Sequence, residues 1–456
     1  LAWSRRGGHD RRIAVNEAPP LPTRRAFLAS LAAFAAVPSA GAAIVGADLS
    51  PTSGDRTEAF RAGLAKAVAE KRPFVLAPGS YQIGPIDLPD GAQIHGTSGL
   101  TTLVLGADGA LMAGRGAKRI VLSGLAFDGQ NRPAGSGATL LAFADVVDLR
   151  LLDCVVGRAS DIGLLIERCG GRIERCTLGA IGSFGLLARD SRALTIADNT
   201  VADCGDGGIL VHRSTPGEDG SVVRGNRVER IRARSGGTGQ FGNGINVYRA
   251  HSVAILENRI TDCAFSGIRV NGGSNARILG NEVLRSGETA LYVEFEFQGA
   301  VVANNIVDGA VNGISVVNSQ QGGRLATVSG NLVRNLKRST SSDPKTPAFG
   351  IAVEADTAIT GNVVEGAPHF GMMLGWGEFL RNVTVTGNVV REAGVGIAVS
   401  VVERAGQTVI TGNVLQATKG GAIVGYRWGE AATGDLALGG LPIPAHLTIE
   451  RNRTAP

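Results

Sequence analysis

Polar and aromatic residues recur at one place in a repeated pattern, Gly-Ile-x-Val-x, where each x alternates with an apolar residue. Because successive side chains of a strand point to opposite faces, Ile and Val point inward and the x residues point outward. In the middle of the chain the outward residues are Asn246 and Tyr248, Arg269 and Asn271, Tyr292 and Glu294, and later Glu354. Just beyond these positions lie Glu296, Asn318, Asp356 and Trp376.

Two kinds of carbohydrate chemistry suit these residue types. In a polysaccharide lyase, a base removes a proton beside a uronate carboxylate while a cation stabilises the developing charge. Arg269 would neutralise the carboxylate, and Tyr292, Tyr248 or His212 would carry the proton. In a glycoside hydrolase two carboxylates flank the scissile bond. Glu294 and Glu354 stand two repeats apart, or about 9 to 10 Å, at the upper end of the range for an inverting pair.

Two long inserts, residues 231–243 and 336–349, precede the repeats at either end of this polar stretch. The outward residues would then form the floor of a groove, and the two inserts its walls. Four steps of about 4.8 Å span roughly 19 Å, enough for a few sugar units. Each residue taken alone could equally belong to an ordinary solvated face. We predict catalytic roles for Arg269, Tyr292, Glu294 and Tyr248, and substrate-binding roles for Asn246, Asn271, Glu296, Asn318, Glu354, Asp356 and Trp376. No cofactor is expected, and no Cys or His cluster indicates a metal site.

The elements that must position these residues follow from a second pattern, apolar-x-Gly-Asn-x-apolar. Its period is roughly 22 to 27 residues, a spacing typical of solenoids. The short apolar alternations indicate strands that cannot bury a face alone and must stack. Asn tolerates the left-handed conformation of a tight corner, and stacked Asn side chains can bond as a ladder. The predicted ladder is Asn199, Asn226, Asn258, Asn281, Asn304, Asn331, Asn362, Asn388 and Asn413.

These observations predict an all-β fold, a right-handed, single-stranded parallel β-helix of roughly ten coils. Asp55 with Glu58 three residues later resembles a capping box, so a helix over Asp55–Glu70 is expected to cap the first coil. The predicted divisions are a leader over 1–42, the cap and first coil over 43–110, the β-helix over 111–430, and a partial coil and tail over 431–456. Small residues are wanted at corners, so buried thiols are favoured over a Cys154–Cys176 bridge.

The leader has the three regions of an export signal in order. Arg24 and Arg25 precede an apolar segment, Leu28–Val37, and a small-residue cleavage site, Ala40-Gly41-Ala42. Removing the leader lowers the formal net charge from +5 to +1, because it holds six Arg against one Asp and one Glu. The mature body therefore carries no footprint of nucleic-acid binding. No apolar run approaches the roughly 20 residues of a membrane span.

The start of the body resembles that of pectate-lyase-like β-helix proteins through Gly54-Asp55-Arg56-Thr57 and Ala77-Pro78-Gly79-Ser80-Tyr81. Together with the paired Arg and the Gly-Asn repeats, nearly the whole chain resembles the bacterial twin-arginine-translocated repetitive proteins. This resemblance implies export by the twin-arginine machinery to the periplasm or exterior, and it implies no particular activity. The Asp clusters of calcium-dependent lyases and the Asp-rich pattern of polygalacturonases are absent from the outward positions.

Two functions therefore remain open. One is a lyase or hydrolase acting on an acidic or envelope polysaccharide. The other is a non-catalytic protein that binds an envelope glycan or organises the cell surface. Perturbed titratable groups in a groove would favour the first function. A flat polar face with solvated charges would favour the second, and the fold alone decides neither.

The export hypothesis makes a direct prediction. Changing both Arg24 and Arg25 to Lys should leave the precursor in the cytoplasm, because the paired Arg is the feature that routes the chain. Cell fractionation followed by detection of the precursor and mature forms measures the outcome. Normal export of the double variant would refute this route.

Overall fold

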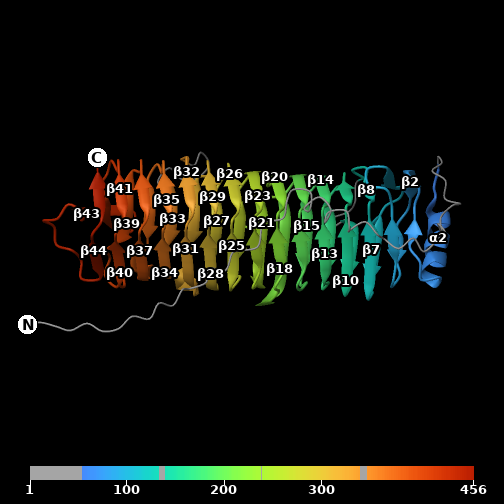
Figure 1. Cartoon of the computed structure of the whole chain (residues 1–456), viewed down its shortest axis with the longest axis horizontal. Helices are drawn as coiled ribbons and strands as arrows, with labels where there is room; N and C mark the ends of the chain where they lie inside the picture. The colour runs from blue at the N-terminus through green and yellow to red at the C-terminus, as the bar shows by residue number, and fades with distance from the viewer. Residues whose placement is uncertain (1–53, 133–138, 238, 339–346, 456) are drawn as a thin grey trace, which may run out of the picture. The chain divides into compact units, whose positions relative to one another are not determined.

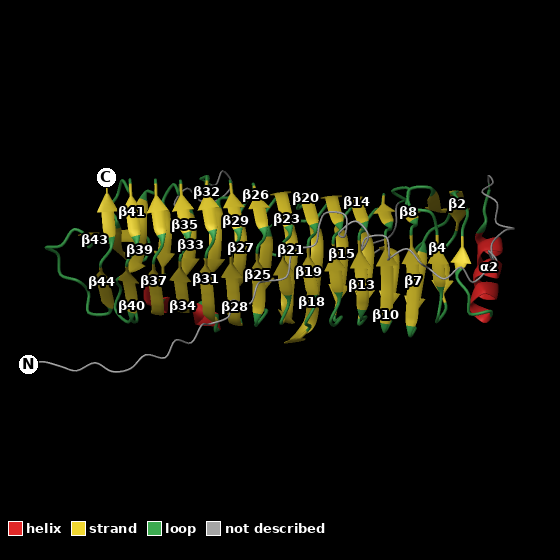
Figure 2. Ribbon diagram, viewed as in Figure 1, coloured by secondary structure: helices red, strands yellow, loops and turns green. Residues whose placement is uncertain are grey.

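The computed structural model describes residues 54–132, 139–237, 239–338 and 347–455. After one helix, α2 (Thr57–Ala69), the chain winds through short strands, and each of the first 39 strands pairs with the strand three places further on. Figures 1 and 2 show the strands succeeding one another from α2 at the blue end to β43 (Glu430–Asp435) at the red end. In the part described, no helix is long and apolar enough to cross a membrane. The export signal lies outside the described residues.

The strands form three sheets of 15 strands each. Sheet A consists of β1 (Phe74–Val75), β4 (Gln93–His95), β7 (Arg119–Ser123), β10 (Asp148–Leu152), β13 (Gly171–Glu174), β16 (Thr195–Ala197), β19 (Val222–Arg224), β22 (Ala254–Leu256), β25 (Ala276–Leu279), β28 (Gln298–Ala303), β31 (Arg324–Ser329), β34 (Ala355–Thr360), β37 (Arg381–Thr386), β40 (Thr408–Thr411) and β44 (Leu447–Glu450). Sheet B consists of β2 (Gly79–Ile83), β5 (Thr101–Leu105), β8 (Ala126–Asp128), β11 (Val155–Gly157), β14 (Thr177–Ile181), β17 (Thr200–Cys204), β20 (Arg227–Ile231), β23 (Arg259–Cys263), β26 (Glu282–Leu284), β29 (Ile306–Asp308), β32 (Leu332–Arg334), β35 (Val363–Glu365), β38 (Val389–Arg391), β41 (Val414–Gln416) and β45 (Arg453–Ala455). Sheet C consists of β3 (Ile86–Leu88), β6 (Met112–Arg115), β9 (Thr139–Ala144), β12 (Ile162–Glu167), β15 (Phe184–Arg189), β18 (Gly207–Glu218), β21 (Asn243–His251), β24 (Ile268–Asn271), β27 (Thr289–Glu294), β30 (Asn312–Val316), β33 (Phe349–Val353), β36 (Phe370–Leu374), β39 (Val395–Ser400), β42 (Ile423–Arg427) and β43.

The predicted fold class is confirmed as an all-β parallel solenoid, with more coils than the roughly ten expected. The strands pair in parallel, except that β43 turns back antiparallel to β42. Sheets A and B continue through β44 and β45, beyond residue 430. The core is a column of inward residues such as Ile245, Ile268 and Leu291, each fully buried and stacked on the next.

Helix α2 covers the first coil through its apolar face. Phe60 is fully buried, and its ring lies 5.1 Å from that of Phe74, edge to face. The helix begins two residues later than expected, with Arg56 at the N-cap position. The Asp55 carboxylate still accepts the Thr57 N–H at 2.9 Å, so Asp55 satisfies one of the donors exposed in the first turn.

The Gly-Asn repeats build a buried ladder of amides between sheets A and B. Asn281 is typical, because its N–H and its Nδ2 both donate to Oδ1 of Asn305, at 2.8 and 3.0 Å. Its Nδ2 also donates to the Ile255 carbonyl at 2.9 Å, and its own Oδ1 accepts from Asn258. The ladder continues without interruption from Asn199 to Asn452 through Asn226, Asn258, Asn281, Asn305, Asn331, Asn362, Asn388 and Asn413.

The rung predicted at Asn304 is wrong, because Asn305 forms it. The residue before each rung, not the rung itself, takes the left-handed conformation, and that residue is usually Gly, as at Gly280 (φ +67°) and Gly330 (φ +64°). At this repeat the left-handed residue is Asn304 (φ +57°), which is exposed while Asn305 is buried. The apolar register moves by one residue as well, so Val302 and Val307 face the core instead of Val301 and Ile306.

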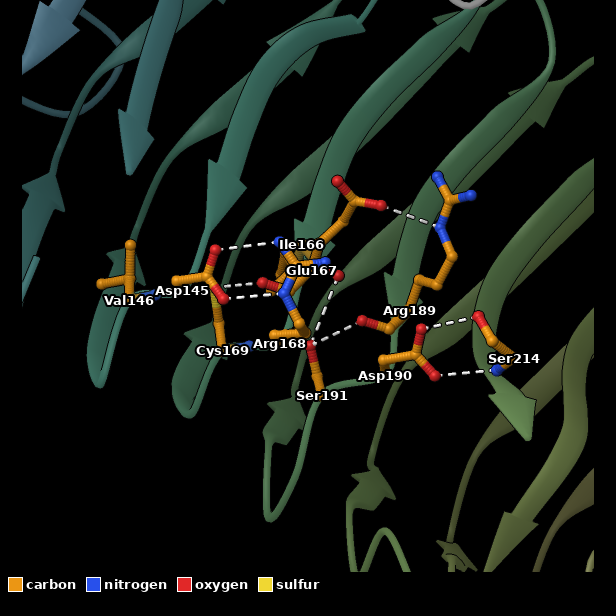
Figure 3. A network of polar contacts seen from close by, with 10 residues as sticks. All are labelled: Asp145, Val146, Ile166, Glu167, Arg168, Cys169, Arg189, Asp190, Ser191 and Ser214. Atoms are coloured by element: carbon orange, nitrogen blue, oxygen red, sulfur yellow. Dashed lines mark hydrogen bonds and ion pairs between the residues drawn. The ribbon is translucent and has the colours of Figure 1, made fainter. Parts of the chain in front are cut away.

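A second corner, where strands of sheet C end, is held by ion pairs and hydroxyls (Figure 3). The Arg168 guanidinium donates through two nitrogens to the Asp145 carboxylate of the preceding coil, at 2.7 and 2.8 Å. In the following coil Asp190 accepts from the N–H and the Oγ of Ser214, both at 2.7 Å. Ser191 lies beneath and accepts the Cys169 N–H at 3.1 Å. Adjacent coils are therefore linked at this corner as well.

The five cysteines are all buried and unbridged. Cys154 and Cys176 occupy the ladder corner before Asn199, as the sequence analysis expected, and the Cys176 N–H donates to Oδ1 of Asn199 at 2.9 Å. Small thiols thus occupy rungs where the amide ladder has not yet begun.

The ladder predicts a contrast between two neighbouring asparagines. Asn281→Ala should cost about 1–3 kcal/mol, because buried backbone and amide groups lose their partners. Asn304→Gly should change stability by about 0.5 kcal/mol or less, since Gly adopts the same left-handed corner in most repeats and the side chain is exposed. The thermal unfolding midpoints of both variants measure the difference. Equal midpoints would contradict the ladder.

Candidate functional site

The outward rows of sheet C bring the predicted residues together in the expected register. Arg269 pairs with Tyr292 and Asn271 pairs with Glu294 across β24 and β27. Across β21 and β24, Asn246 pairs with Arg269 and Tyr248 pairs with Asn271. The predicted stacking of these side chains is confirmed.

Arg269 and Glu294 are nevertheless buried, so the prediction that they lie on an exposed groove floor is wrong. Arg269 Nε lies 2.6 Å from Oε1 of Glu294, and the two side chains are only 8% and 2% exposed. Asn271 Nδ2 donates to the same oxygen at 2.9 Å. A buried charge requires a partner, and here each ion supplies the other's. The pair therefore links two adjacent strands, β24 and β27, on the outward face of sheet C.

Tyr292 lies under the same guanidinium. Arg269 Cζ is 5.0 Å from the centroid of the Tyr292 ring, a cation–π contact. Burial, and then the neighbouring Glu294 carboxylate, raise the pKa of the Tyr292 phenol well above its usual range. Tyr292 therefore stays protonated at physiological pH.

The second carboxylate of the predicted hydrolase pair is also engaged within the protein. Glu354 is 7% exposed, and its Oε2 accepts the Ser319 N–H at 2.6 Å, from the short helix η1 (Ser319–Gln321). Burial raises the pKa of Glu354. Ser319 Oγ in turn donates to the Phe379 carbonyl at 3.0 Å. Glu354 thus holds η1 against sheet C.

The remaining predicted residues are spread around this region. The Asp356 carboxylate accepts hydrogen bonds from Arg381 and Asn382 at 3.0 and 2.8 Å, and so links two coils at the corner beyond sheet C. Asn318 is left-handed (φ +73°) and precedes η1. Glu296 is exposed, two residues beyond the end of β27.

An open cleft of about 540 Å³ lies beside the buried pair, over β18, β21 and β24. It contains three of the predicted residues, Asn246, Tyr248 and Asn271. The other residues that line it are His212, Ser235, Gly236, Gly237, Gly239, Gln240 and Phe241. None of these described lining residues is Asp, Glu, Lys or Arg. We call this site the polar cleft.

The insert after β20 forms one wall of the polar cleft and is anchored at both ends. Ser235 donates through its N–H and its Oγ to the Asp206 carboxylate, both at 2.7 Å. The Phe241 ring stacks on Phe184 with centroids 6.3 Å apart and planes 10° apart. Asn246 Nδ2 lies 3.4 Å from the Gly239 carbonyl oxygen. The wall is therefore held by contacts within the protein.

His212 is the titratable group of this cleft. Its ring lies 5.7 Å from that of Tyr248, edge to face, and its Nε2 is buried with no hydrogen-bond partner among the described residues. Burial, with a smaller effect from Arg189, lowers the pKa of His212 to about 4. The imidazole is therefore neutral at pH 7. His212 occupies the same repeat position as Tyr248, one coil earlier, and this position in the pattern identified it from the sequence.

Trp376 lies elsewhere, in a pocket of about 340 Å³ near the C-terminal end of sheet C. It lies there with Tyr426 and Trp428, residues that the repeat pattern did not single out. Of the predicted site residues, three therefore line the polar cleft, Trp376 lines this pocket, and the others line neither. Among the described residues no group of three or more His, Cys, Asp or Glu is placed to hold a metal ion.

Comparisons with known proteins agree with this fold. Residues 162–333 match the family model of the right-handed β-helix region. No curated protein matches the chain.

Three similar solved structures illustrate the range of the fold. The catalytic unit of a thermostable GH87 α-1,3-glucanase from Streptomyces thermodiastaticus is 15% identical with a TM-score of 0.47, over 90% of this chain and 69% of that one. The Dettilon tailspike protein is also 15% identical at a TM-score of 0.47, over 83% and 67%. PfbA, a surface adhesin of Streptococcus pneumoniae, is 13% identical at a TM-score of 0.45, over 82% and 89%. Each of these three proteins is similar to this chain in fold only.

The neutral His212 makes stability depend on pH. Its pKa is about 4 when folded against 6.5 ordinarily, so below pH 6.5 the unfolded chain binds a proton that the folded chain does not. Stability should fall by up to about 3 kcal/mol as pH drops from 6.5 to 4. His212→Gln should show a smaller fall over this window in the thermal unfolding midpoint. Identical pH profiles for the two proteins would contradict a neutral His212.

Proposed function

We propose that the chain is an exported protein that binds a polysaccharide, and that the polar cleft holds one or more of its sugar units. The observation that carries this proposal is the lining of the cleft. Amide, hydroxyl and aromatic side chains converge there, none of them charged, beside a wall held by contacts within the protein. Amides and hydroxyls match the donors and acceptors of sugar hydroxyls, and aromatic faces pack on sugar rings.

The uncharged lining favours neutral sugar units in contact with the cleft. Three arginines border the lining without being part of it: Arg189 pairs in register with His212, Arg249 lies 4.8 Å over the Tyr248 ring, and Arg269 pairs in register with Asn246. The Arg269 guanidinium is bound to Glu294 beneath the surface, so its binding a uronate would mean breaking a buried ion pair. Removing one partner from such a pair is costly, on the order of 3–5 kcal/mol. A glycoside hydrolase built on Glu294 and Glu354 is disfavoured for the same reason, since both carboxylates already accept hydrogen bonds from the protein.

A second candidate function is β-elimination. It is favoured by His212, which is neutral, lies beside Tyr248 and has no hydrogen-bond partner for Nε2 among the described residues. In that reaction the buried Nε2 would first have to be uncovered by movement of the imidazole, and it would then take the proton from the sugar carbon next to the carboxylate. The electron pair would form a carbon–carbon double bond as the glycosidic carbon–oxygen bond breaks. The leaving oxygen would then take the phenol proton of Tyr248. Both residues line the same cleft.

Binding can be tested by calorimetry with a panel of neutral and uronate oligosaccharides. Tyr248→Ala should weaken binding about tenfold, because the ring loses its contact with the sugar. Tyr292→Phe is the matched control and should bind as the parent does, since Tyr292 lies outside the lining of the cleft. Unchanged affinity in Tyr248→Ala, for a glycan that the parent binds, would remove the polar cleft from consideration.

The same panel separates binding from elimination. Unsaturated products would establish a lyase, and His212→Gln should then abolish turnover while binding persists. New reducing ends without unsaturation would indicate hydrolysis and contradict both candidate functions. Binding without either product supports the first proposal.

Export by the twin-arginine route is part of this proposal, and so is membership of the twin-arginine-translocated repetitive proteins. The leader offers its own control for the double Lys variant, because Arg11 and Arg12 form another adjacent pair. Changing that pair to Lys should leave export unaffected, since no apolar segment follows it directly.

A further inference from the structure

We propose that a second sugar-binding site, independent of the polar cleft, lies in the pocket of about 340 Å³ near the C-terminal end of sheet C. We call it the aromatic pocket. Its ligand would be an uncharged sugar ring, inserted so that its apolar faces meet aromatic side chains. The volume is near the lower end of the range of about 300–1,000 Å³ for small-molecule sites.

The stacked strands supply the floor of the aromatic pocket. In successive coils the outward row reads Met373, Ala398 and Val424, and the neighbouring row reads Gly375, Ser400 and Tyr426. Small and apolar outward residues replace the polar residues of the earlier coils. Phe370 and Tyr426 pack edge to face at 5.0 Å and close one side.

Two tryptophans also line the pocket. The Trp376 and Trp428 rings lie 5.8 Å apart at 75° and are 37% and 48% exposed. Trp428 rests directly on Gly377, where an added Cβ would collide with its ring. Gly375 and Gly377 both have positive φ, at +75° and +59°, so the segment around Trp376 is shaped by glycine. The exposed aromatic surface is therefore held in place by contacts within the protein.

The backbone of Trp428 is costly for a tryptophan. It forms the tip of the hairpin between β42 and β43 with φ +54°, a left-handed conformation that Gly or Asn adopts more easily. A bulky residue at positive φ costs free energy that the surroundings must offset. The ring packs on Trp376 and Phe379, yet Trp428 is still 48% exposed, so a large aromatic surface faces solvent. A role in contacting a ligand accounts for both features.

The polar groups of the aromatic pocket are neutral donors. His369 Nδ1 accepts the Ala348 N–H at 2.7 Å, which leaves Nε2–H as the donor of a neutral ring. The Tyr426 phenol is a second donor on the lining. No Asp, Glu, Lys or Arg is among the described residues that line the pocket. An uncharged ligand with both hydroxyls and an apolar face fits this lining, whereas an aliphatic chain would leave these donors unmatched.

The aromatic pocket is separate from the polar cleft. Asn246 and Met373 share one outward row and are five strand steps apart, about 24 Å. Between them Ser315 and Ala352 are buried, 3% and 0% exposed. A sugar chain cannot run along this row from one site to the other. The two sites can therefore fail or succeed independently.

Tryptophan fluorescence reports on this site directly, because Trp376 and Trp428 are two of the three tryptophans in the chain and Trp3 can be changed to Phe. The full-length Trp3→Phe protein would be titrated with cellohexaose, maltohexaose and mannohexaose, with hexagalacturonate and decanoate for comparison. We expect a saturable change with at least one neutral hexasaccharide, and none with hexagalacturonate or decanoate.

Variants then place the binding. Trp376→Ala should weaken it about tenfold or more, read from the remaining Trp428, while Trp376→Phe should keep most of it. Gly377→Ala should also weaken binding, because it displaces the Trp428 ring. Tyr248→Ala, in the polar cleft, should leave this titration unchanged. Thermal unfolding of each variant checks that the fold is retained.

Several results would overturn the proposal. They are a saturable response to decanoate alone, equal binding by hexagalacturonate, full binding by Trp376→Ala, or no saturable response to any of the three neutral sugars. Loss of this binding in Tyr248→Ala would instead show that the two sites depend on each other, and would contradict their independence. Failure of the polar cleft to bind any glycan would leave the result for the aromatic pocket standing.

Discussion

The stacking of one coil directly on the next is the constraint on which the rest of this structure depends. Parallel strands about 4.8 Å apart satisfy the backbone within the sheets, but the corners between sheets turn their polar groups toward the interior. The asparagine ladder meets that need, because each amide bonds its own coil to both neighbours. A corner that bonds in this way must repeat in register, and every side chain between corners is therefore aligned with its counterparts above and below.

That alignment explains why the charged residues Arg269, Glu294 and Glu354 on the outward face of sheet C are buried. Arg269 stacks on Tyr292 because the register pairs these two residues, and its guanidinium binds the nearby Glu294, so both charges are buried. Glu354 is used in the same way, to hold η1. Two cavities lie at the ends of this buried stretch. The polar cleft, beside a glycine-rich wall, is lined by amides and hydroxyls, and the aromatic pocket, beside a hairpin tip, is lined by aromatic rings.

Much of this could be predicted from the sequence, because a solenoid converts spacing into position. The Gly-Asn pattern predicted the sheets, the ladder and the pairs Arg269–Tyr292 and Asn271–Glu294. It misplaced a rung at Asn304, where two adjacent asparagines made the pattern ambiguous. It could not show that Glu294 is buried, since that depends on how the side chains of Arg269 and Asn271 turn toward its carboxylate. Nor could it assemble the aromatic pocket, because Trp376 and Trp428 meet across a turn in the chain that follows no repeat.

The asparagine ladder also has a direction. From Asn199 to Asn452 each Nδ2 donates to Oδ1 of the next coil and never the reverse, so the amide dipoles point the same way along the stack. Hydrogen bonds arranged head to tail polarise one another, and each strengthens its neighbours. The rungs thus share their stabilisation, and the contribution of one coil depends on the length of intact ladder on either side. In this respect the interior of the solenoid behaves as a single polarised chain running across covalently distant parts of the protein.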